Sequence, residues 1–217
     1  MGAFTGMTAL LGNLVPIAER LGYPESSICV LKGDIDVLEK EFPKTYSNLM
    51  GCNHNRDNRA PIQYGKDLVA SWIYEDFLME QLKLVGITIE GAGADKNREI
   101  LALAKVSAAS DCLVTYNGKS RKLEIMNDYK GYWANNRCLD LRDAKYEKLS
   151  RENSIFLGVA PLHKKYVVLD FSERIEATFI PHHPPYGFKS VYQVPISPDA
   201  LKELDFTRIA NEVLGLF

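Results

Sequence analysis

Long apolar runs, a basic leader and paired cysteines are all missing from this sequence of 217 residues. No stretch approaches the roughly 18 consecutive apolar residues that a membrane-spanning helix needs, and residues 1–7 lack the basic region of a secretory signal. The four cysteines form no Cys-x-x-Cys pair, which favours reduced thiols over a disulfide framework. We therefore expect a cytoplasmic protein with no membrane partner.

An excess of charge of either sign is also missing. The chain has 26 Lys and Arg against 28 Asp and Glu, a formal net charge of −2, so no global positive field indicates a polyanionic partner. A basic groove on a nearly neutral protein is still compatible with these totals. The 46% of hydrophobic and 25% of charged residues are typical of a globular protein and exclude a disordered, collagen-like or coiled-coil chain. The length favours a single domain over residues 1–217.

Helical periodicity and turn residues predict the elements of the first half of the chain. These are helices over 8–22, 34–50 and 65–84, a polar loop over 51–59, a strand over 85–89, a glycine-rich turn at 91–93 and a short helix over 97–105. The helix over 65–84 has the clearest periodicity. Asp34 is the expected N-cap of the helix that follows it.

The second half of the chain mixes strands with helices. The expected elements are strands over 112–116 and 121–129, a helix over 140–150, strands over 155–159 and 166–171, a rigid loop over 181–185, an edge strand over 190–195 and a helical segment over 199–217. Asn117-Gly118 predicts a tight hairpin between the first two strands. The strands over 155–159 and 166–171 show no polar alternation, which is typical of strands buried on both faces. The fold class is therefore α/β, with one core.

Acidic side chains are expected to gather on one face of the hairpin. Because side chains alternate along a strand, four residues share that face: Lys122, Glu124, Met126 and Asp128. The hairpin also brings Asp111 toward Glu124 or Asp128. Clustered carboxylates repel one another, and a hard divalent cation such as Mg²⁺ would neutralise them. A solvated strand face with ordinary salt bridges is the alternative interpretation.

Glu75 lies on the apolar stripe of the helix over 65–84, between Trp72 and Met79. A carboxylate on the buried face of a helix needs a partner. That partner is either an arginine, such as Arg98 or Arg142, or the same metal ion that the hairpin carboxylates would hold.

The order of these elements resembles that of the PD-(D/E)xK, or restriction-endonuclease-like, nuclease superfamily. Ser110-Asp111 corresponds to the Pro-Asp half of the motif, Glu124-Ile125-Met126 to the (D/E)xK half, and the following helix and strand come in the family's order. The resemblance covers about residues 65–171. It implies a mixed central sheet flanked by helices, with a catalytic core over 65–171, a helical N-terminal part over 1–60 and a C-terminal strand and helix extension over 175–217.

The resemblance implies a Mg²⁺-dependent endonuclease that hydrolyses DNA phosphodiester bonds by in-line attack of water and leaves a 3′-hydroxyl. Asp111 and Glu124 would be its metal ligands and Glu75 its helix carboxylate. One such site in each 24.4 kDa subunit favours a homodimer that cuts a short palindromic site in double-stranded DNA, as a type II restriction enzyme does. A catalytically impaired nucleic-acid-binding protein on the same fold and a repair or recombination nuclease remain alternatives.

Met126 departs from the family pattern, which has a lysine at this position. A thioether donates no hydrogen bond, so it cannot stabilise the charge that develops on phosphorus. Three interpretations follow: Lys122 or Lys145 supplies the amine from elsewhere, the metal ion suffices alone, or the chain is impaired. We expect a migrated lysine.

The segment after the strand over 121–129 combines amides, cations and aromatic rings. Amides and arginines read base edges, and cations hold phosphates. The candidate DNA-binding residues are Asn127, Lys130, Asn135, Asn136, Arg137 and Arg142. The rings of Tyr132 and Trp133 fit a core aromatic cluster equally well. We expect the pair His182-His183 to shape a surface loop or a dimer contact, and the dimer contact to lie within 1–60 or 175–217.

Overall fold

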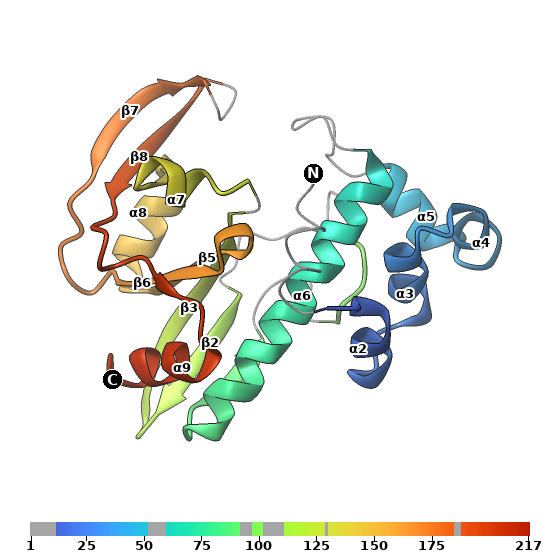
Figure 1. Cartoon of the computed structure of the whole chain (residues 1–217), viewed down its shortest axis with the longest axis horizontal. Coiled ribbons are helices and arrows are strands. Elements are labelled where there is room, and N and C mark those ends of the chain that lie inside the picture. Colours follow the sequence, from blue (N-terminus) through green and yellow to red (C-terminus); the bar gives the residue numbers. More distant parts are fainter. Residues whose placement is uncertain (1–11, 52–59, 92–96, 102–110, 129, 185–187) are drawn as a thin grey trace. The chain divides into compact units, whose positions relative to one another are not determined.

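The structure is a computed structural model, and it describes residues 12–51, 60–91, 97–101, 111–128, 130–184 and 188–217 (Figure 1). The chain forms two compact units. Unit 1 comprises Met1–Phe77 and Gly91–Ala109, and unit 2 comprises Leu78–Glu90 and Ser110–Phe217. Within the described ranges, no helix combines the length and the apolar character required to cross a membrane.

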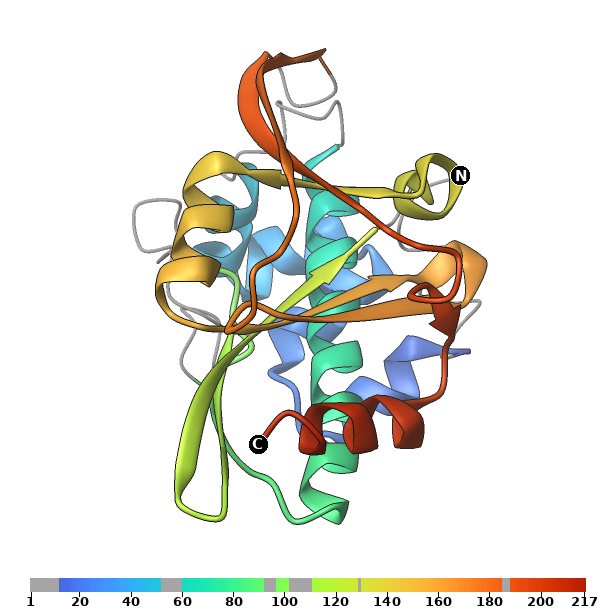
Figure 2. The same ribbon diagram turned by 90° about the vertical axis from the view of Figure 1, so that its left-hand side faces the viewer.

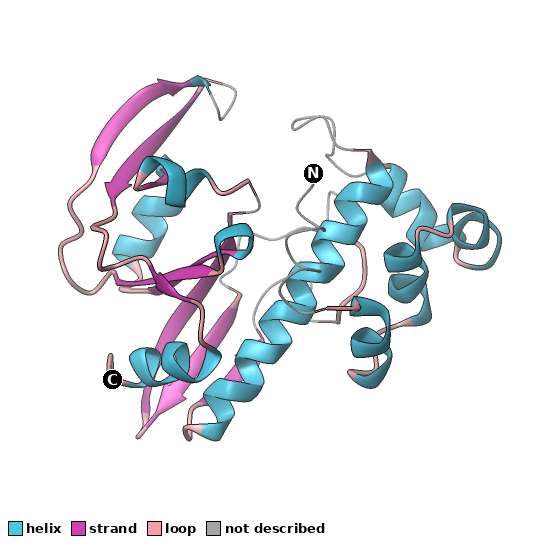
Figure 3. Cartoon of the chain, viewed as in Figure 1, coloured by secondary structure: helices cyan, strands magenta, loops and turns pink. Residues whose placement is uncertain are grey.

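Most of the described residues of unit 1 are helical (Figure 3). Its helices are α2 (Leu14–Arg20), α3 (Glu25–Lys32), α4 (Ile35–Glu41), α5 (Pro43–Met50) and the first part of α6 (Pro61–Leu84). The expected single helix over 34–50 is wrong, because Phe42 has an extended φ of −130° and Pro43 starts a new helix. Asp34 occupies the N-cap position, but its side chain makes no capping hydrogen bond.

Other expectations for the first half of the chain hold only in part. The helix expected over 8–22 is described from residue 14, where Asn13 caps it by accepting a hydrogen bond from the Val15 amide at 3.2 Å. Residues 97–101 are not helical, and the rest of the helix expected over 97–105 lies outside the described residues. The expected strand over 85–89 begins later, as β1 (Thr88–Gly91). The polar loop at 52–59 and most of the turn at 91–93 also lie outside the described residues.

Unit 2 is built on a six-stranded mixed sheet with the strand order β1-β2-β3-β5-β6-β9. After β1 its strands are β2 (Cys112–Tyr116), β3 (Lys119–Asn127), β5 (Ile155–Ala160), β6 (Lys165–Asp170) and β9 (Lys202–Glu203). β3 and β5 run parallel, whereas β2-β3 and β5-β6 are antiparallel. The hairpin prediction is confirmed, since Asn117 and Gly118 connect β2 to β3 with positive φ values of 47° and 75°. Every residue of β5 is buried, as its apolar run predicts, whereas β6 is only partly buried.

A second sheet of three strands, in the order β4-β8-β7, packs over one face of the large sheet. Its strands are β4 (Cys138–Arg142), β8 (Lys189–Pro195) and β7 (Thr178–His183), and the accompanying helices are α7 (Tyr132–Asn136), α8 (Asp143–Arg151), the 3₁₀ turn η3 (Pro161–His163) and α9 (Phe206–Leu214). The helix expected over 140–150 begins only at Asp143, since the preceding residues form β4. The helical segment expected over 199–217 contains β9 as well as α9.

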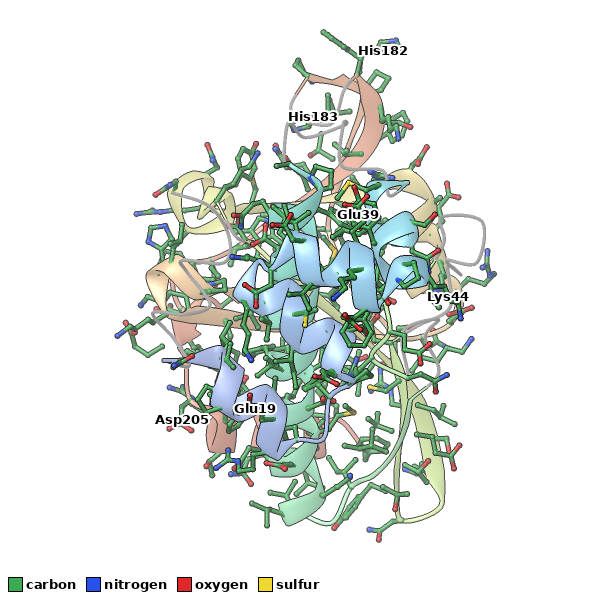
Figure 4. All side chains as sticks on the ribbon, turned by 90° about the vertical axis from the view of Figure 1, so that its right-hand side faces the viewer. Glu19, Glu39, Lys44, His182, His183 and Asp205 are labelled. Carbon is green, nitrogen blue, oxygen red and sulfur yellow. The ribbon has the colours of Figure 1, made fainter. Side chains whose placement is uncertain are left out.

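The rigid loop expected over 181–185 is wrong in its first half. Pro181 and the two histidines belong to strand β7, which forms the edge of the small sheet, where a proline is tolerated. Figure 4 shows His182 at the outer end of the β7-β8 arm and His183 nearer the body of unit 2. His183 is buried, and its Nε2 lies 2.8 Å from Oδ2 of the buried Asp140 on β4. This histidine therefore belongs to the packing between β7 and β4 rather than to a surface loop.

The core between the two sheets contains side chains from β4, α8, β5 and β8. It includes Leu141, Leu149, Phe156 and Val194, all at most 2% exposed. Tyr166 lies on the opposite face of the large sheet, where its hydroxyl donates a hydrogen bond of 2.7 Å to Glu212 of α9. Helices thus flank both faces of a mixed central sheet, and the predicted α/β class is confirmed.

Candidate active site

Asp111 and Glu124 lie opposite each other at the beginning of the β2-β3 ladder. The pairing of Cys112 with Leu123 places the two carboxylates in register on neighbouring strands. Asp111 Oδ2 accepts a hydrogen bond of 2.6 Å from the backbone amide of Ile125, which fixes the Asp111 carboxylate beside Glu124. Of the two neighbours that the sequence offered for Asp111, the structure selects Glu124.

Glu124 is buried and faces helix α8. Its parallel-strand partner, Phe156, packs in the core with Leu149 of α8, so Glu124 points to the same face of the sheet. Lys145 Nζ donates a hydrogen bond to Glu124 Oε1, and Lys148 Nζ lies 4.0 Å from Oε2. Because the two lysines are three residues apart on α8, they share one face of that helix.

The second carboxylate oxygen of Glu124, Oε2, is buried and accepts no hydrogen bond from the described residues. The Glu124 side chain is 6% exposed, and within the described part of the chain no donor lies within hydrogen-bond distance of Oε2. A buried charged oxygen without a hydrogen bond is costly. Among the described residues, the cation nearest to this oxygen is the ammonium of Lys148, at 4.0 Å.

Lys122 and Met126 share the strand face of Glu124 but have other partners. Lys122 Nζ lies 3.0 Å from Glu152 Oε1, and its side chain is 45% exposed. Met126 packs against the core between the two sheets. Between the two lysines that the sequence offered in place of a motif lysine, Lys145 is the one that reaches Glu124.

Asp128 is buried and serves a local structural purpose. Its Oδ2 accepts a hydrogen bond of 2.6 Å from the Trp133 amide, and its own amide donates to Val159 O at 2.6 Å. These two bonds fix the start of α7 against the end of β5.

Glu75 belongs to unit 1, where it pairs with an arginine. Arg98 Nη1 donates a hydrogen bond of 2.9 Å to Glu75 Oε2. An arginine partner was one of the two alternatives that the sequence left open for Glu75. The same guanidinium bonds Asp76, which also accepts a hydrogen bond from the Tyr23 hydroxyl. Sequence reasoning missed Asp76 and Tyr23. A role for Glu75 beside the hairpin carboxylates stays a prediction.

The electrostatics of this arginine cluster keep it ionised. Burial lowers the pKa of Arg98, but the hydrogen bond to Asp76 and the charges of both carboxylates outweigh burial and raise it. Burial, reinforced by the neighbouring Asp76, raises the pKa of Tyr23, so its hydroxyl keeps its proton and remains a donor.

Five of the six predicted DNA-binding residues lie within ten positions of α7 in the chain, between the end of β3 and the start of β4, and Arg142 ends β4 at the N-cap of α8. The segment expected as a loop is helical over Tyr132–Asn136, and Trp133 is buried in the core, as the alternative interpretation held for that ring. Asn127 ends β3 and is half-buried, whereas the other five candidates are exposed: Lys130, Asn135, Asn136, Arg137 and Arg142. Asn136 donates a hydrogen bond of 2.9 Å to Tyr132 O.

The donor set at Glu124 fits Mg²⁺. The described residues contain no group of three or more His, Cys, Asp or Glu side chains suited to a metal ion. Mg²⁺ is commonly held by one or two carboxylates, with water and phosphate oxygens completing its coordination. Asp111, directly before β2, and Glu124 of β3 would supply two hard oxygen ligands, and Glu124 Oε2 has no hydrogen-bond partner among the described residues.

Comparisons with known proteins find similarity in structure but not in sequence. No family model matches the chain, and no curated protein matches its sequence. Among solved structures, the chain is similar to Hjc, a Holliday junction resolvase from the archaeal hyperthermophile Archaeoglobus fulgidus. The identity is 11% and the TM-score 0.37, over 64% of this chain and 97% of that chain.

Proposed function

We propose that this protein is a Mg²⁺-dependent DNA endonuclease of the restriction-endonuclease-like superfamily. The observation that carries the proposal is the buried Glu124, which lies opposite Asp111 and beside two lysines of α8. A carboxylate in such a position costs folding free energy unless it is paired. Facing carboxylates with an adjacent amine are suited to phosphodiester hydrolysis. The carboxylates can hold a metal cation, and the amine can stabilise the charge that develops on the phosphate.

The residues of the site have distinct roles in this proposal. Asp111 and Glu124 would hold Mg²⁺, which when bound activates water and polarises the phosphate. The Ile125 amide orients Asp111, and Lys145 orients Glu124 through Oε1. Lys145 would also supply the amine that Met126 lacks, because an ammonium has three donors and one of them is used by Glu124.

A double-strand break requires two cuts, one in each strand. Each chain carries one pair of hairpin carboxylates, so two chains would supply the two sites. We therefore propose a homodimer that cuts a short palindromic site in double-stranded DNA, in the manner of a type II restriction enzyme. The exposed Lys130, Arg137 and Arg142 are the cations proposed to contact its phosphates. The dimer contact is proposed to lie within 1–60 or 175–217.

Plasmid cleavage by Glu124→Gln tests the proposal. The change keeps the shape of the side chain and removes its charge, so we expect cleavage in Mg²⁺ to fall by at least about 100-fold. Glu147→Gln is the matched control, since Glu147 is an exposed carboxylate on α8. Its cleavage rate should equal that of the unmodified protein, and EDTA should abolish both.

The outcomes of this assay separate the candidate functions. Retained activity in a folded Glu124→Gln variant would remove Glu124 from the site. Binding of DNA by the unmodified protein without nicking at any concentration would favour the impaired binding protein. Discrete fragments from linear DNA support a restriction enzyme, whereas cleavage confined to branched junctions supports a recombination nuclease.

A further inference from the structure

A basic recess of about 260 Å³ lies in unit 2, beyond the ends of β3 and β5. α7 and the η3 turn lie on the same side of unit 2 (Figure 2). The polar residues that line the recess are Arg137 after α7, His163 of η3, Lys165 of β6 and Ser197 after β8. The recess is separate from Glu124 and the lysines of α8.

The lining of the recess is suited to an anion. No carboxylate is among its described lining residues. Lys165 forms an ion pair with Glu203, whose side chain is 74% exposed. Arg137 and His163 make no side-chain hydrogen bond or ion pair within the described ranges, so their donors are available. A guanidinium, an imidazole and a hydroxyl around one small cavity match the oxygens of a phosphate group.

The backbone holds Arg137 in place before any ligand arrives. Its φ of 53° is left-handed, a conformation that is unfavourable for a residue with a Cβ. Two backbone hydrogen bonds of 2.8 Å maintain it, one from the Arg137 amide to Trp133 O and one from the Ile196 amide to Arg137 O. Because Trp133 is anchored in the core, the recess is fixed to the same core as the sheet.

His163 is confined in a similar way. Gly131, with a φ of +70°, lies against the imidazole so closely that a Cβ at position 131 would overlap the ring. Close packing of this kind limits the orientations of the ring. A preorganised site loses less conformational entropy when it binds a ligand.

We propose that this recess binds a phosphate group of the DNA backbone at a distance from the bond that is cut. That the phosphate belongs to DNA rests on the proposed function. β3 and β5 are parallel, with Phe156 paired to Glu124, and β5 ends four residues later at Ala160, about 13 Å along the strand. A DNA strand presents one phosphate per roughly 3.4 Å of its axis, so the recess lies within reach of the same strand.

Arg137→Gln tests the proposal, with Arg151→Gln as the matched control on the exposed end of α8. Binding to a duplex oligonucleotide is measured without divalent metal at several salt concentrations. For Arg137→Gln we expect about 10-fold weaker binding and a salt slope smaller by about one, the signature of one lost phosphate contact. Arg151→Gln should leave both quantities unchanged. His163→Gln should also weaken binding to the duplex oligonucleotide.

A second arm titrates inorganic phosphate into the same variants by calorimetry. Phosphate binding that Arg137→Gln removes, together with an unchanged DNA affinity and slope, would assign the recess to free phosphate and overturn its role in DNA binding. Unchanged binding of both ligands would overturn the site altogether, even if the unmodified protein cleaves DNA. A reduced salt slope in a protein that never cleaves would support the recess and refute the endonuclease.

Discussion

Lys145→Gln is the change that most directly tests which amine serves the site. Lys145 Nζ bonds the buried Glu124, whereas Lys122 pairs with Glu152 on the surface. A hydrogen bond between charged groups contributes a net of about 1.5–3 kcal/mol. Because Lys148 Nζ remains 4.0 Å from Glu124 Oε2 and the Lys145 side chain is 36% exposed, the cost in stability should be at the lower end, about 1–2 kcal/mol.

The effect on catalysis should exceed the effect on stability. If the amine stabilises the charge that develops on phosphate, its loss should slow cleavage by about 100–1,000-fold. Lys122→Gln breaks a half-exposed surface pair, so its rate should change less than about five-fold, the equivalent of 1 kcal/mol. Single-turnover cleavage at saturating Mg²⁺ measures the rates, and urea unfolding gives the folded fraction that corrects them.

Two results would refute this reasoning. A slow Lys122→Gln beside an unaffected Lys145→Gln would move the catalytic amine to the strand. Normal rates in both variants would leave a mechanism that depends on the metal ion alone. Lys145→Arg serves as the conservative control, because it keeps the charge and should recover part of the activity.

Two further predictions concern stability. Burial alone would raise the pKa of Asp170, but hydrogen bonds, led by the one from Arg121, lower it to about 2. The ionised carboxylate therefore stabilises the fold above pH 3.8, and this contribution is lost as the pH falls through about 2. Asp170→Asn should therefore lower the free energy of unfolding, measured with urea at pH 7, by about 2 kcal/mol. The difference in stability between the variant and the unmodified protein should shrink between pH 4 and pH 2. A constant difference, or an equal loss in the exposed control Asp199→Asn, would contradict this. Arg98→Met should lower the free energy of unfolding by about 3 kcal/mol, since it leaves the carboxylates of Glu75 and Asp76 without the arginine cation. An unchanged thermal midpoint would show that this cluster contributes nothing to stability.

The parts of the fold that the sequence predicts are those with strong local signals. Asn117-Gly118 specifies the hairpin because few other residue pairs accept two positive φ values. β5 is recognisable as an apolar run because it is buried on both faces. The break before Pro43 was present in the sequence as well, since the residue that precedes a proline disfavours the helical conformation.

β4 and β7 depend on partners that are distant in the chain. β4 pairs with β8 along its whole length, so its strand conformation is set by residues more than 40 positions later. β7 contains a proline and two histidines, and only its edge position in the small sheet makes such a strand acceptable. The buried contact between His183 and Asp140 is likewise tertiary, and no local pattern indicates it.

The candidate site divides in the same way. The predicted hairpin brings Asp111 toward Glu124 or Asp128, and the antiparallel register in the structure places it opposite Glu124. The choice between Lys122 and Lys145 requires the packing of α8 on the sheet, which periodicity does not supply. For Glu75 the sequence left open an arginine partner, such as Arg98 or Arg142, or a metal ion, and the structure pairs it with Arg98.

Met126 and Lys145 are two consequences of the same packing. Met126 shares the strand face of Glu124, is partly buried and packs against the core between the sheets. Lys145 comes from α8, whose Leu149 belongs to that core, and its chain is partly exposed, so its ammonium remains solvated on one side. In this protein the amine at Glu124 is therefore positioned by the contacts that hold the two sheets together, and a methionine at position 126 does not by itself exclude the proposed activity.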